Sequence, residues 1–483
     1  MLFFSKRKLR VLVLVLGIAF LIAATTRAVI QFQLGEEVNH YNTYFSTHKD
    51  SLHDIYDPLN IKQIPYETIN VLYENRVMEE GQRQKSIDWS KFAYVSYATE
   101  PEYLCNTVIL FEKLKQFGTK AKLVVLVSKD LLDSENSDQI VCERLLERIR
   151  EVDSEQVVIK LVDEIAKPKD STPWNKSFTK LLVFNQTEYE RIIYLDSDAA
   201  LFDSMDELFF LPSYVNFAAP LTYWFISESD LQASYKERRS DNKTPVKLES
   251  VIKTLNTRAK KGQPIYNHLP SLPSSLVFRS GKIAKEITES NSLLANLFKL
   301  RRGTTSSRVK FASDIMVIKP NSLTFQKIAQ LLIPNSWGQK EQYDMDLIND
   351  GLYNLKEIIN SQFLLFRKLR SAFVPEVMVL PFGKYGLLTG SVRERFHHEL
   401  MANDILGYKK SQDATGPSLD SLVANCKYIH YSDWPINKPW LYSSFDELKC
   451  KPKDKNEELD VEMCKTWNSI LQGFWDSKHM CQA

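Results

Sequence analysis

Residues 191–203 read RIIYLDSDAALFD, and this stretch decides the fold. The apolar run 192–195 is typical of a buried strand. Asp196, Ser197 and Asp198 follow at the point where such a strand would leave the core and meet solvent. Two carboxylates one residue apart at a strand end can hold the same hard cation, and oxygen ligands suit Mn²⁺ or Mg²⁺. The stretch therefore predicts a metal site at the carboxyl end of a central strand.

Strand patterns alternate with helix patterns around this stretch. Strands are expected at 92–97, 122–127, 157–162 and 191–196, and helices at 99–118, 141–151 and 176–189. This alternation predicts a parallel, doubly wound sheet, whose ligands bind at the carboxyl ends of its strands. The sequence contains no GxGxxG and no Walker A loop, so neither a dinucleotide nor an ATP-type phosphate cradle is indicated.

The motifs, taken in order, resemble those of the family 8 retaining glycosyltransferases, the group that includes glycogenin. The stretches that carry the resemblance are KLLVFNQTEYERIIYLDSDAALF (180–202), FASDIMVIKP (311–320), DMDLIN (344–349) and IHYSDWPINKPW (429–440). The ordered set extends over roughly residues 92–442. The resemblance implies a type A glycosyltransferase fold over residues 91–445, with a Rossmann-like central sheet and helices on both of its faces.

A closer resemblance is to the fungal Golgi N-acetylglucosaminyltransferases that modify the mannose side chains of N-linked glycans. It is carried by WSKFAYV, YLCNT, TKLLVFNQTE, PLTYWF, IYNHLPSLP and YGLLTGS. This resemblance implies metal-dependent, retaining transfer of N-acetylglucosamine (GlcNAc) from UDP-GlcNAc to mannose residues of N-glycans.

The resemblance also implies site residues. Asp196, Asp198 and His430 would bind the metal; Ala98, Thr99, Tyr103, Lys180, Asp196, Ser197, Asp198 and Lys438 would bind the nucleotide-sugar; and Asp344 and Lys438 would be catalytic. From the residues alone, ordinary roles stay open. His430 could be a core histidine, Lys180 and Lys438 could be solvated lysines, and Asp344-Met345-Asp346 could be a solvated helix face.

The donor-sugar pocket departs from the family pattern. Where the family motif has Asn and Gly, this chain has Ala312 and Asp314, and Met345 and Asp433 replace a Gln and a Gly. The metal site is therefore expected to be retained, while the sugar contacts differ. Two other functions stay open: transfer of another UDP-hexose such as glucose or galactose, and a catalytically silent glycan-binding membrane protein.

The N-terminal sequence predicts a type II membrane protein. Residues 11–26, VLVLVLGIAFLIAATT, carry no charge and follow a basic flank. Because a basic flank stays in the cytosol, we expect a cytosolic tail (1–10), a signal-anchor helix in the lipid bilayer (11–30) and a lumenal stem (31–90). The transferase domain would follow the stem, and residues 446–483 would form a C-terminal extension. A cleaved signal peptide is the alternative. A Golgi membrane location follows from the anchor and the resemblance.

Composition excludes one class of partner. The chain has 62 Lys and Arg against 60 Asp and Glu, so its charge gives no reason to expect nucleic acid. Six cysteines would permit disulfides in an oxidising lumen, with the four near the C-terminus the expected partners, or could be buried free thiols. Asn-x-Ser/Thr triplets stand at Asn175, Asn185 and Asn242.

Overall fold

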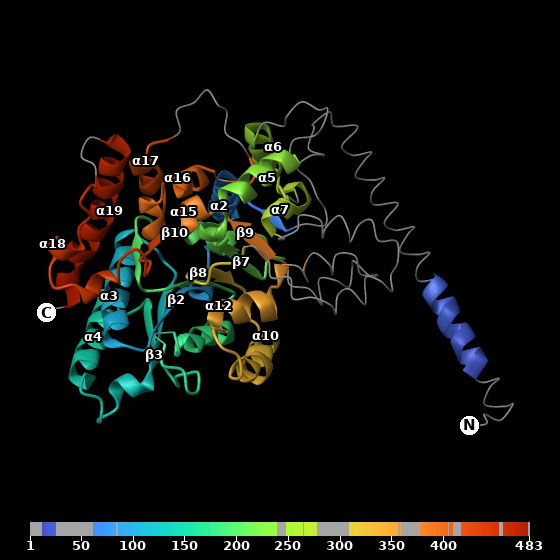
Figure 1. The fold of residues 1–483 in the computed structure, drawn as a ribbon. Coiled ribbons are helices and arrows are strands. Elements are labelled where there is room, and N and C mark those ends of the chain that lie inside the picture. Colours follow the sequence, from blue (N-terminus) through green and yellow to red (C-terminus); the bar gives the residue numbers. More distant parts are fainter. Residues whose placement is uncertain are drawn as a thin grey trace.

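The computed structural model describes residues 12–25, 61–83, 86–172, 174–238, 248–263, 265–277, 309–355, 358, 377–403, 405–408, 417–453 and 457–481. Within these ranges, an eight-stranded sheet and a three-stranded sheet lie at the centre, and helices surround them (Figure 1). The main sheet has the strand order β1-β9-β7-β8-β5-β2-β3-β4. Its strands are β1 (Lys62–Gln63), β2 (Phe92–Ala98), β3 (Lys122–Ser128), β4 (Val157–Val162), β5 (Arg191–Leu195), β7 (Phe217–Pro220), β8 (Ile315–Ile318) and β9 (Val377–Leu380).

The sheet is mixed, not parallel as predicted. Strand β8 runs antiparallel to both β5 and β7, while the other neighbouring strands are parallel. Hydrophobic periodicity reports that a segment is a strand but carries no information about its direction, so β8 could not be oriented from its sequence. The four strands predicted from sequence are confirmed as β2, β3, β4 and β5.

The helical predictions hold in part. Helices α3 (Pro101–Gln116) and α4 (Gln139–Val152) lie where helices were expected. The segment predicted as a helix at 176–189 is a 3-10 helix, η4 (Ser177–Asn185). The remaining longer helices are α2 (Tyr66–Arg83), α5 (Glu228–Arg238), α6 (Leu248–Lys260), α16 (Arg395–Met401) and α19 (Glu458–Ser477), and shorter ones are α7 (Ser274–Val277), α10 (Ser322–Lys327), α11 (Ile333–Ser336), α12 (Asp344–Asp346), α15 (Phe382–Tyr385), α17 (Leu419–Ala424) and α18 (Phe445–Leu448).

Strand β2 shows how both faces of the sheet are filled. Ala93 and Val95 belong to the apolar cluster on one face, where η4 also packs. Phe92 and Tyr94 belong to the cluster on the other face, which α3 and α4 cover. Side chains alternate between faces along a strand, so both faces of a central strand must be apolar. Each buried large apolar side chain contributes about 1.5–3 kcal/mol.

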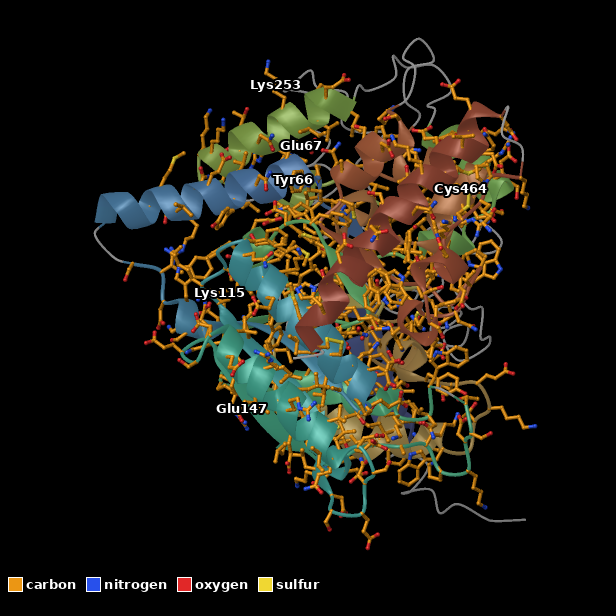
Figure 2. All side chains as sticks on the ribbon, turned by 90° about the vertical axis from the view of Figure 1, so that its left-hand side faces the viewer. Tyr66, Glu67, Lys115, Glu147, Lys253 and Cys464 are labelled. Atoms are coloured by element: carbon orange, nitrogen blue, oxygen red, sulfur yellow. A yellow bond between two sulfur atoms is a disulfide. The ribbon has the colours of Figure 1, made fainter. Side chains whose placement is uncertain are left out.

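The N-terminal edge of the folded domain lies before the predicted residue 91. Strand β1 pairs with β9, and α2 runs alongside α6, with a hydrogen bond from Thr68 to Asn256 (Figure 2). Residues 61–83 of the predicted stem therefore pack on the domain. The predicted domain began at residue 91 and left them out, because α2 has a weak apolar face and β1 is only two residues long.

The predicted C-terminal extension is also part of the packed structure. Helix α19 buries Trp467, Ile470 and Phe474 in the main core. A disulfide joins Cys481 to Cys105 of α3, and a second joins Cys450 to Cys464. The expectation that the C-terminal cysteines pair among themselves is thus right for Cys450 and Cys464, and wrong for Cys481 and for Cys426, whose thiol is free.

Two cysteines are free, and two of the three Asn-x-Ser/Thr asparagines lie among the described residues. Cys142 and Cys426 are buried free thiols, which was the alternative left open for the cysteines. Of the residues in Asn-x-Ser/Thr triplets, Asn185 is exposed and Asn175 is half-buried. Asn242 lies outside the described residues.

Residues 12–25 form a helix with exposed side chains. Among the described helices, none has both the length and the apolar character needed to cross a membrane. The rest of the predicted anchor (residues 11 and 26–30), the predicted cytosolic tail and residues 31–60 of the stem lie outside the described residues.

Candidate active site

The two sheets meet at the carboxyl end of β5, where the chain passes through Asp196-Ser197-Asp198 into β6 (Ala199–Leu201). In the three-stranded sheet, β6 pairs with β11 (Tyr428–His430), and β11 pairs with β10 (Leu387–Leu388). His430 stands opposite Ala199 in the antiparallel ladder. The backbone N–H of Tyr431 donates to the carbonyl of Asp198 (2.9 Å). This pairing brings His430 beside the carboxylate of Asp198.

Asp196, Asp198 and His430 form a cluster suited to a metal ion. One potential ligand atom from each residue lies within 4.8 Å of the others. Burial lowers the pKa of His430 to about 3, so its imidazole is neutral, as a metal ligand must be. Its Nδ1 makes no hydrogen bond and lies 3.5 Å from Asp198 Oδ1. Two carboxylates and a neutral imidazole fit Mn²⁺ or Mg²⁺.

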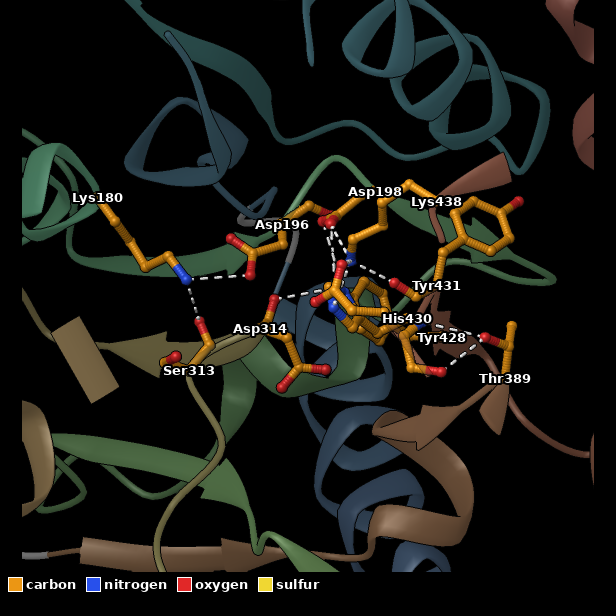
Figure 3. A network of polar contacts seen from close by, with 12 residues as sticks. Lys180, Asp196, Asp198, Ser313, Asp314, Thr389, Tyr428, His430, Tyr431 and Lys438 are labelled. Atoms are coloured by element: carbon orange, nitrogen blue, oxygen red, sulfur yellow. Dashed lines mark hydrogen bonds and ion pairs between the residues drawn. The ribbon is translucent and has the colours of Figure 1, made fainter. Parts of the chain in front are cut away.

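Two buried lysines approach these carboxylates from opposite sides (Figure 3). Lys180 Nζ lies 3.0 Å from Asp196 Oδ2 and 3.0 Å from Asp344 Oδ2. Lys438 Nζ lies 2.9 Å from Asp198 Oδ2 and also donates to the carbonyl of Tyr431. Neither lysine is solvated, so the alternative that both are ordinary surface lysines is wrong. Both ammonium groups are placed where phosphate oxygens of a ligand could bind them.

The carboxyl groups of Asp196 and Asp198 have very different pKa values. Burial raises the pKa of Asp196 to about 7, and the charge of Asp198 adds to this effect. Burial also opposes the charge on Asp198, but His430 and Lys438 outweigh it and bring that pKa to about 2. Lys180 divides its charge between Asp196 and Asp344, whereas Lys438 lies directly on Asp198. A divalent cation would supply the positive charge that Asp196 lacks.

The two carboxylates of the second Asp-x-Asp, Asp344 and Asp346, have different partners. Asp344 is buried and faces Lys180. Asp346 instead pairs with Lys310 (2.6 Å) and accepts from the backbone N–H of Tyr343 (3.0 Å). The solvated-face interpretation therefore fails for Asp344.

The residues expected to bind the nucleotide line the adjoining strand end. Ala98 and Thr99 are both buried at the end of β2. Thr99 does not cap α3, because the N-cap residue is Glu100. Tyr103 is half-buried, with its ring centroid 5.8 Å from that of Trp440. Ser197 is buried, and its hydroxyl makes no hydrogen bond.

Several residues of the site were not predicted from sequence. Tyr194 donates its hydroxyl to Asp196, and Tyr428 donates to the carbonyl of Asp314 (3.0 Å). Strand alternation could have found Tyr194, because it stands two residues before Asp196 on the same face. Trp440 ends the quoted motif at 429–440, but its contact with Tyr103 depends on packing between distant segments and could not be read from the motif.

Sequence comparison with known proteins identifies the family of the chain. The chain is 51% identical over 486 residues to Glucose N-acetyltransferase 1 of Saccharomyces cerevisiae, with 99% of each chain covered. It is 42% identical to Glucose N-acetyltransferase 1-B of Kluyveromyces lactis, again with 99% of each covered. The chain belongs to the glucose N-acetyltransferase 1 family. The predicted resemblance to the fungal N-acetylglucosaminyltransferases is thereby confirmed, and the protein is an enzyme.

More distant matches are weaker. Glycogenin of Neurospora crassa is 26% identical over 141 residues, covering 27% of this chain and 18% of that protein. The galactosyltransferase LgtC, solved with donor and acceptor sugar analogues, matches with a TM-score of 0.36 and 10% identity, covering 78% of this chain and 96% of that one. A structural similarity at this level gives no functional role to any residue of the chain. No family model matches the chain.

Proposed function

We propose that this enzyme transfers GlcNAc from UDP-GlcNAc to mannose residues of N-linked glycans, with Mn²⁺ or Mg²⁺ bound by Asp196, Asp198 and His430. The proposal rests on the meeting of these three ligands with Lys438 at the carboxyl end of β5. A purely glycan-binding protein would have no use for a buried lysine on the metal-site carboxylate. The site therefore favours an enzyme that releases a diphosphate.

The name of the relatives mentions glucose and an N-acetyl group, and N-acetylglucosamine is glucose with an acetamido group in place of the 2-hydroxyl. The same name can be read as transfer of an acetyl group to a sugar nitrogen. The site favours sugar transfer, because a divalent ion and two lysines stabilise a departing diphosphate. An acetyl thioester has no diphosphate at the reacting carbon and would leave these charges without a role.

Each residue has a specific role in the proposed reaction. A bound divalent ion would neutralise charge on the diphosphate. Lys438 would donate to the departing diphosphate, and Lys180 would hold Asp344 beside the sugar. The acceptor oxygen forms a bond to the anomeric carbon while the bond from that carbon to the diphosphate breaks. The hydroxyl proton goes to the departing phosphate on the same face, so the product keeps the α configuration.

A Golgi membrane location is part of the proposal. Its support is the uncharged run at residues 11–26 behind the basic flank of Lys6, Arg7, Lys8 and Arg10. Such an anchor would hold the transferase domain in the lumen, where N-glycans are modified. Imaging of the tagged full chain beside Golgi and cytosolic markers tests this part separately from the chemistry.

The activity is tested by measuring UDP release from the purified full chain. UDP-GlcNAc, UDP-glucose and UDP-galactose are supplied in turn, with Mn²⁺ and a mannose oligosaccharide. We expect release from UDP-GlcNAc that chelation or Asp198→Ala abolishes. Asp163→Asn is the matched control, because that carboxylate is 87% exposed and pairs only with Lys129 among the contacts described.

Three other results would contradict the proposal. UDP release from glucose or galactose donors alone would assign another hexose. Release of coenzyme A from acetyl-coenzyme A with glucosamine would assign acetyl transfer. Binding of the oligosaccharide without any turnover of the three donors would favour the silent glycan-binding protein.

A further inference from the structure

Lys167 is a buried lysine that the proposed reaction does not use. It lies in the loop between β4 and η4, and only 6% of the residue is exposed. Its ammonium donates hydrogen bonds to two backbone carbonyls, those of Gln339 (2.6 Å) and Gln342 (3.2 Å). Asp170 Oδ2 lies 3.9 Å away, too far for a hydrogen bond. A buried ammonium needs such compensation, and here the backbone of a segment distant in sequence supplies it.

The segment that Lys167 contacts contains a strained turn. Glu341 stands between Gln339 and Gln342 and has a φ of 55°, in the left-handed region that residues with a side chain rarely adopt. Lys169, in the loop that carries Lys167, is strained in the same way, with a φ of 61°. Strained backbone persists only where surrounding contacts enforce it, and it is frequent at functional sites. The hydrogen bonds from Lys167 flank Glu341 and help to enforce its conformation.

Tyr343 joins the same two loops next to Asp344. Its hydroxyl donates to Asp170 Oδ2 (3.0 Å) and lies 2.9 Å from Thr172 Oγ1. The ammonium of Lys167 lies 4.9 Å from the centre of its ring, within cation–π distance. Tyr343 is the N-cap residue of α12, and Asp344 is the first residue of that helix. The contacts between the loops therefore reach the residue directly before Asp344.

Both loops lead to the Lys180–Asp344 ion pair. The first continues into η4, which carries Lys180, and the second continues into α12, which begins with Asp344. The two charged atoms of the pair lie 3.0 Å apart, and the ammonium of Lys180 also lies 3.0 Å from Asp196 Oδ2. A shift of either loop would change these distances, because each partner follows its loop within a few residues.

We infer that Lys167 is a positioning residue, which fixes Asp344 beside the donor sugar by holding the two loops together. The inference rests on the proposed function, in which Lys180 holds Asp344 at that place. The contacts of Lys167 described above include neither the metal-site residues nor Lys180, so it acts on the reaction through Asp344. The sequence gave no signal for this role, because the contact joins loops that are far apart along the chain.

Steady-state kinetics of UDP release by the full chain test the inference, with Mn²⁺, UDP-GlcNAc and a mannose oligosaccharide. Lys167→Met removes both hydrogen bonds and keeps an unbranched side chain, so kcat should fall about tenfold or more, since small misplacements in a site are costly. The Kd for UDP should stay within about twofold, because UDP has no sugar. The matched control is Lys129→Met, which removes an exposed ammonium paired with Asp163 (2.7 Å) and should change neither value.

A double-mutant cycle with Asp344→Asn separates positioning from a general structural role. If Lys167 acts through Asp344, Lys167→Met should lower kcat by less than about twofold in the Asp344→Asn background. If Lys167→Met does not fold, Tyr343→Phe provides the same cycle, because it removes only the hydroxyl contacts with Asp170 and Thr172. It should lower kcat about threefold in the wild-type background and not further in Asp344→Asn.

Three results would overturn the inference. They are an unchanged kcat in Lys167→Met, an equal loss of kcat in the wild-type and Asp344→Asn backgrounds, and a loss of UDP affinity as large as the loss of kcat. Wild-type protein that releases no UDP from any donor would overturn the proposed function, and the inference with it.

Discussion

His430 Nδ1 lies 3.5 Å from Asp198 Oδ1 because β11 pairs with β6 directly after the Asp-x-Asp turn. The pairing register, with His430 opposite Ala199, fixes the imidazole beside a carboxylate that is distant in sequence. The candidate metal site therefore begins at the end of β5 in the main sheet, and the pairing of β6 with β11 in the small sheet adds His430 to it. Small changes at this junction should affect metal binding before they affect the main core.

Removal of the imidazole ligand should strongly lower metal-dependent activity. His430→Ala is expected to lower kcat about 100-fold or more at a fixed Mn²⁺ concentration, because two carboxylates remain without the imidazole. The measurement is UDP release against Mn²⁺ concentration. Since β11 keeps its backbone pairing, the unfolding midpoint should move little. Wild-type activity of His430→Ala would contradict the metal role.

Lys438 should act on the rate more than on donor binding. Lys438→Met keeps most of the side-chain volume but removes the charge that would face the departing diphosphate. Loss of one such electrostatic group costs about 10²–10³ in kcat. Steady-state kinetics with varied UDP-GlcNAc check this expectation. A raised KM with unchanged kcat would show that Lys438 only holds the ground-state donor.

Metal affinity should depend on pH through Asp196. Burial raises the pKa of Asp196 to about 7, so below this pH a proton must leave before Mn²⁺ binds. The apparent affinity should fall by up to about tenfold for each pH unit below 7 and level off above it. His430, with a pKa of about 3, takes up no proton in this range.

Calorimetric titration with Mn²⁺ from pH 5.5 to 8 tests the role of Asp196. Asp196→Asn should bind the metal more weakly and without this slope, while Asp163→Asn should keep the wild-type profile. A wild-type affinity that stays constant across the range would contradict the prediction.

The sequence predicted the parts of the site that depend on local pattern. The strand before Asp196 and the helix after β2 were found because apolar spacing and strand length are local signals. The direction of β8, the bridge from Cys105 to Cys481 and the position of His430 depend on which distant segments pack together. The meeting of Asp198 with His430 was reached through family resemblance, not through spacing. Asp314 was noted only as a departure from the family motif, because its burial exists only in the fold.

The bridge between Cys105 and Cys481 should support donor binding. Cys105 stands two residues after Tyr103 on α3, and Cys481 ends the segment that follows α19. The ring of Trp440 contacts both Tyr103 (5.8 Å) and Phe474 of α19 (6.2 Å). Removal of the bridge should lower the free energy of unfolding by about 2–4 kcal/mol. It should also raise the KM for UDP-GlcNAc, because Tyr103 loses its support.

The second disulfide provides the matched control for this prediction. Cys450 and Cys464 are separated by 14 residues, against 376 for Cys105 and Cys481. A serine pair at Cys450 and Cys464 should lower stability while leaving the KM near the wild-type value. The single variants Cys105→Ser and Cys481→Ser should each match the double variant, since either one breaks the same bond. Equal KM values for the two double-serine variants would show that the longer bridge stabilises the fold without positioning Tyr103.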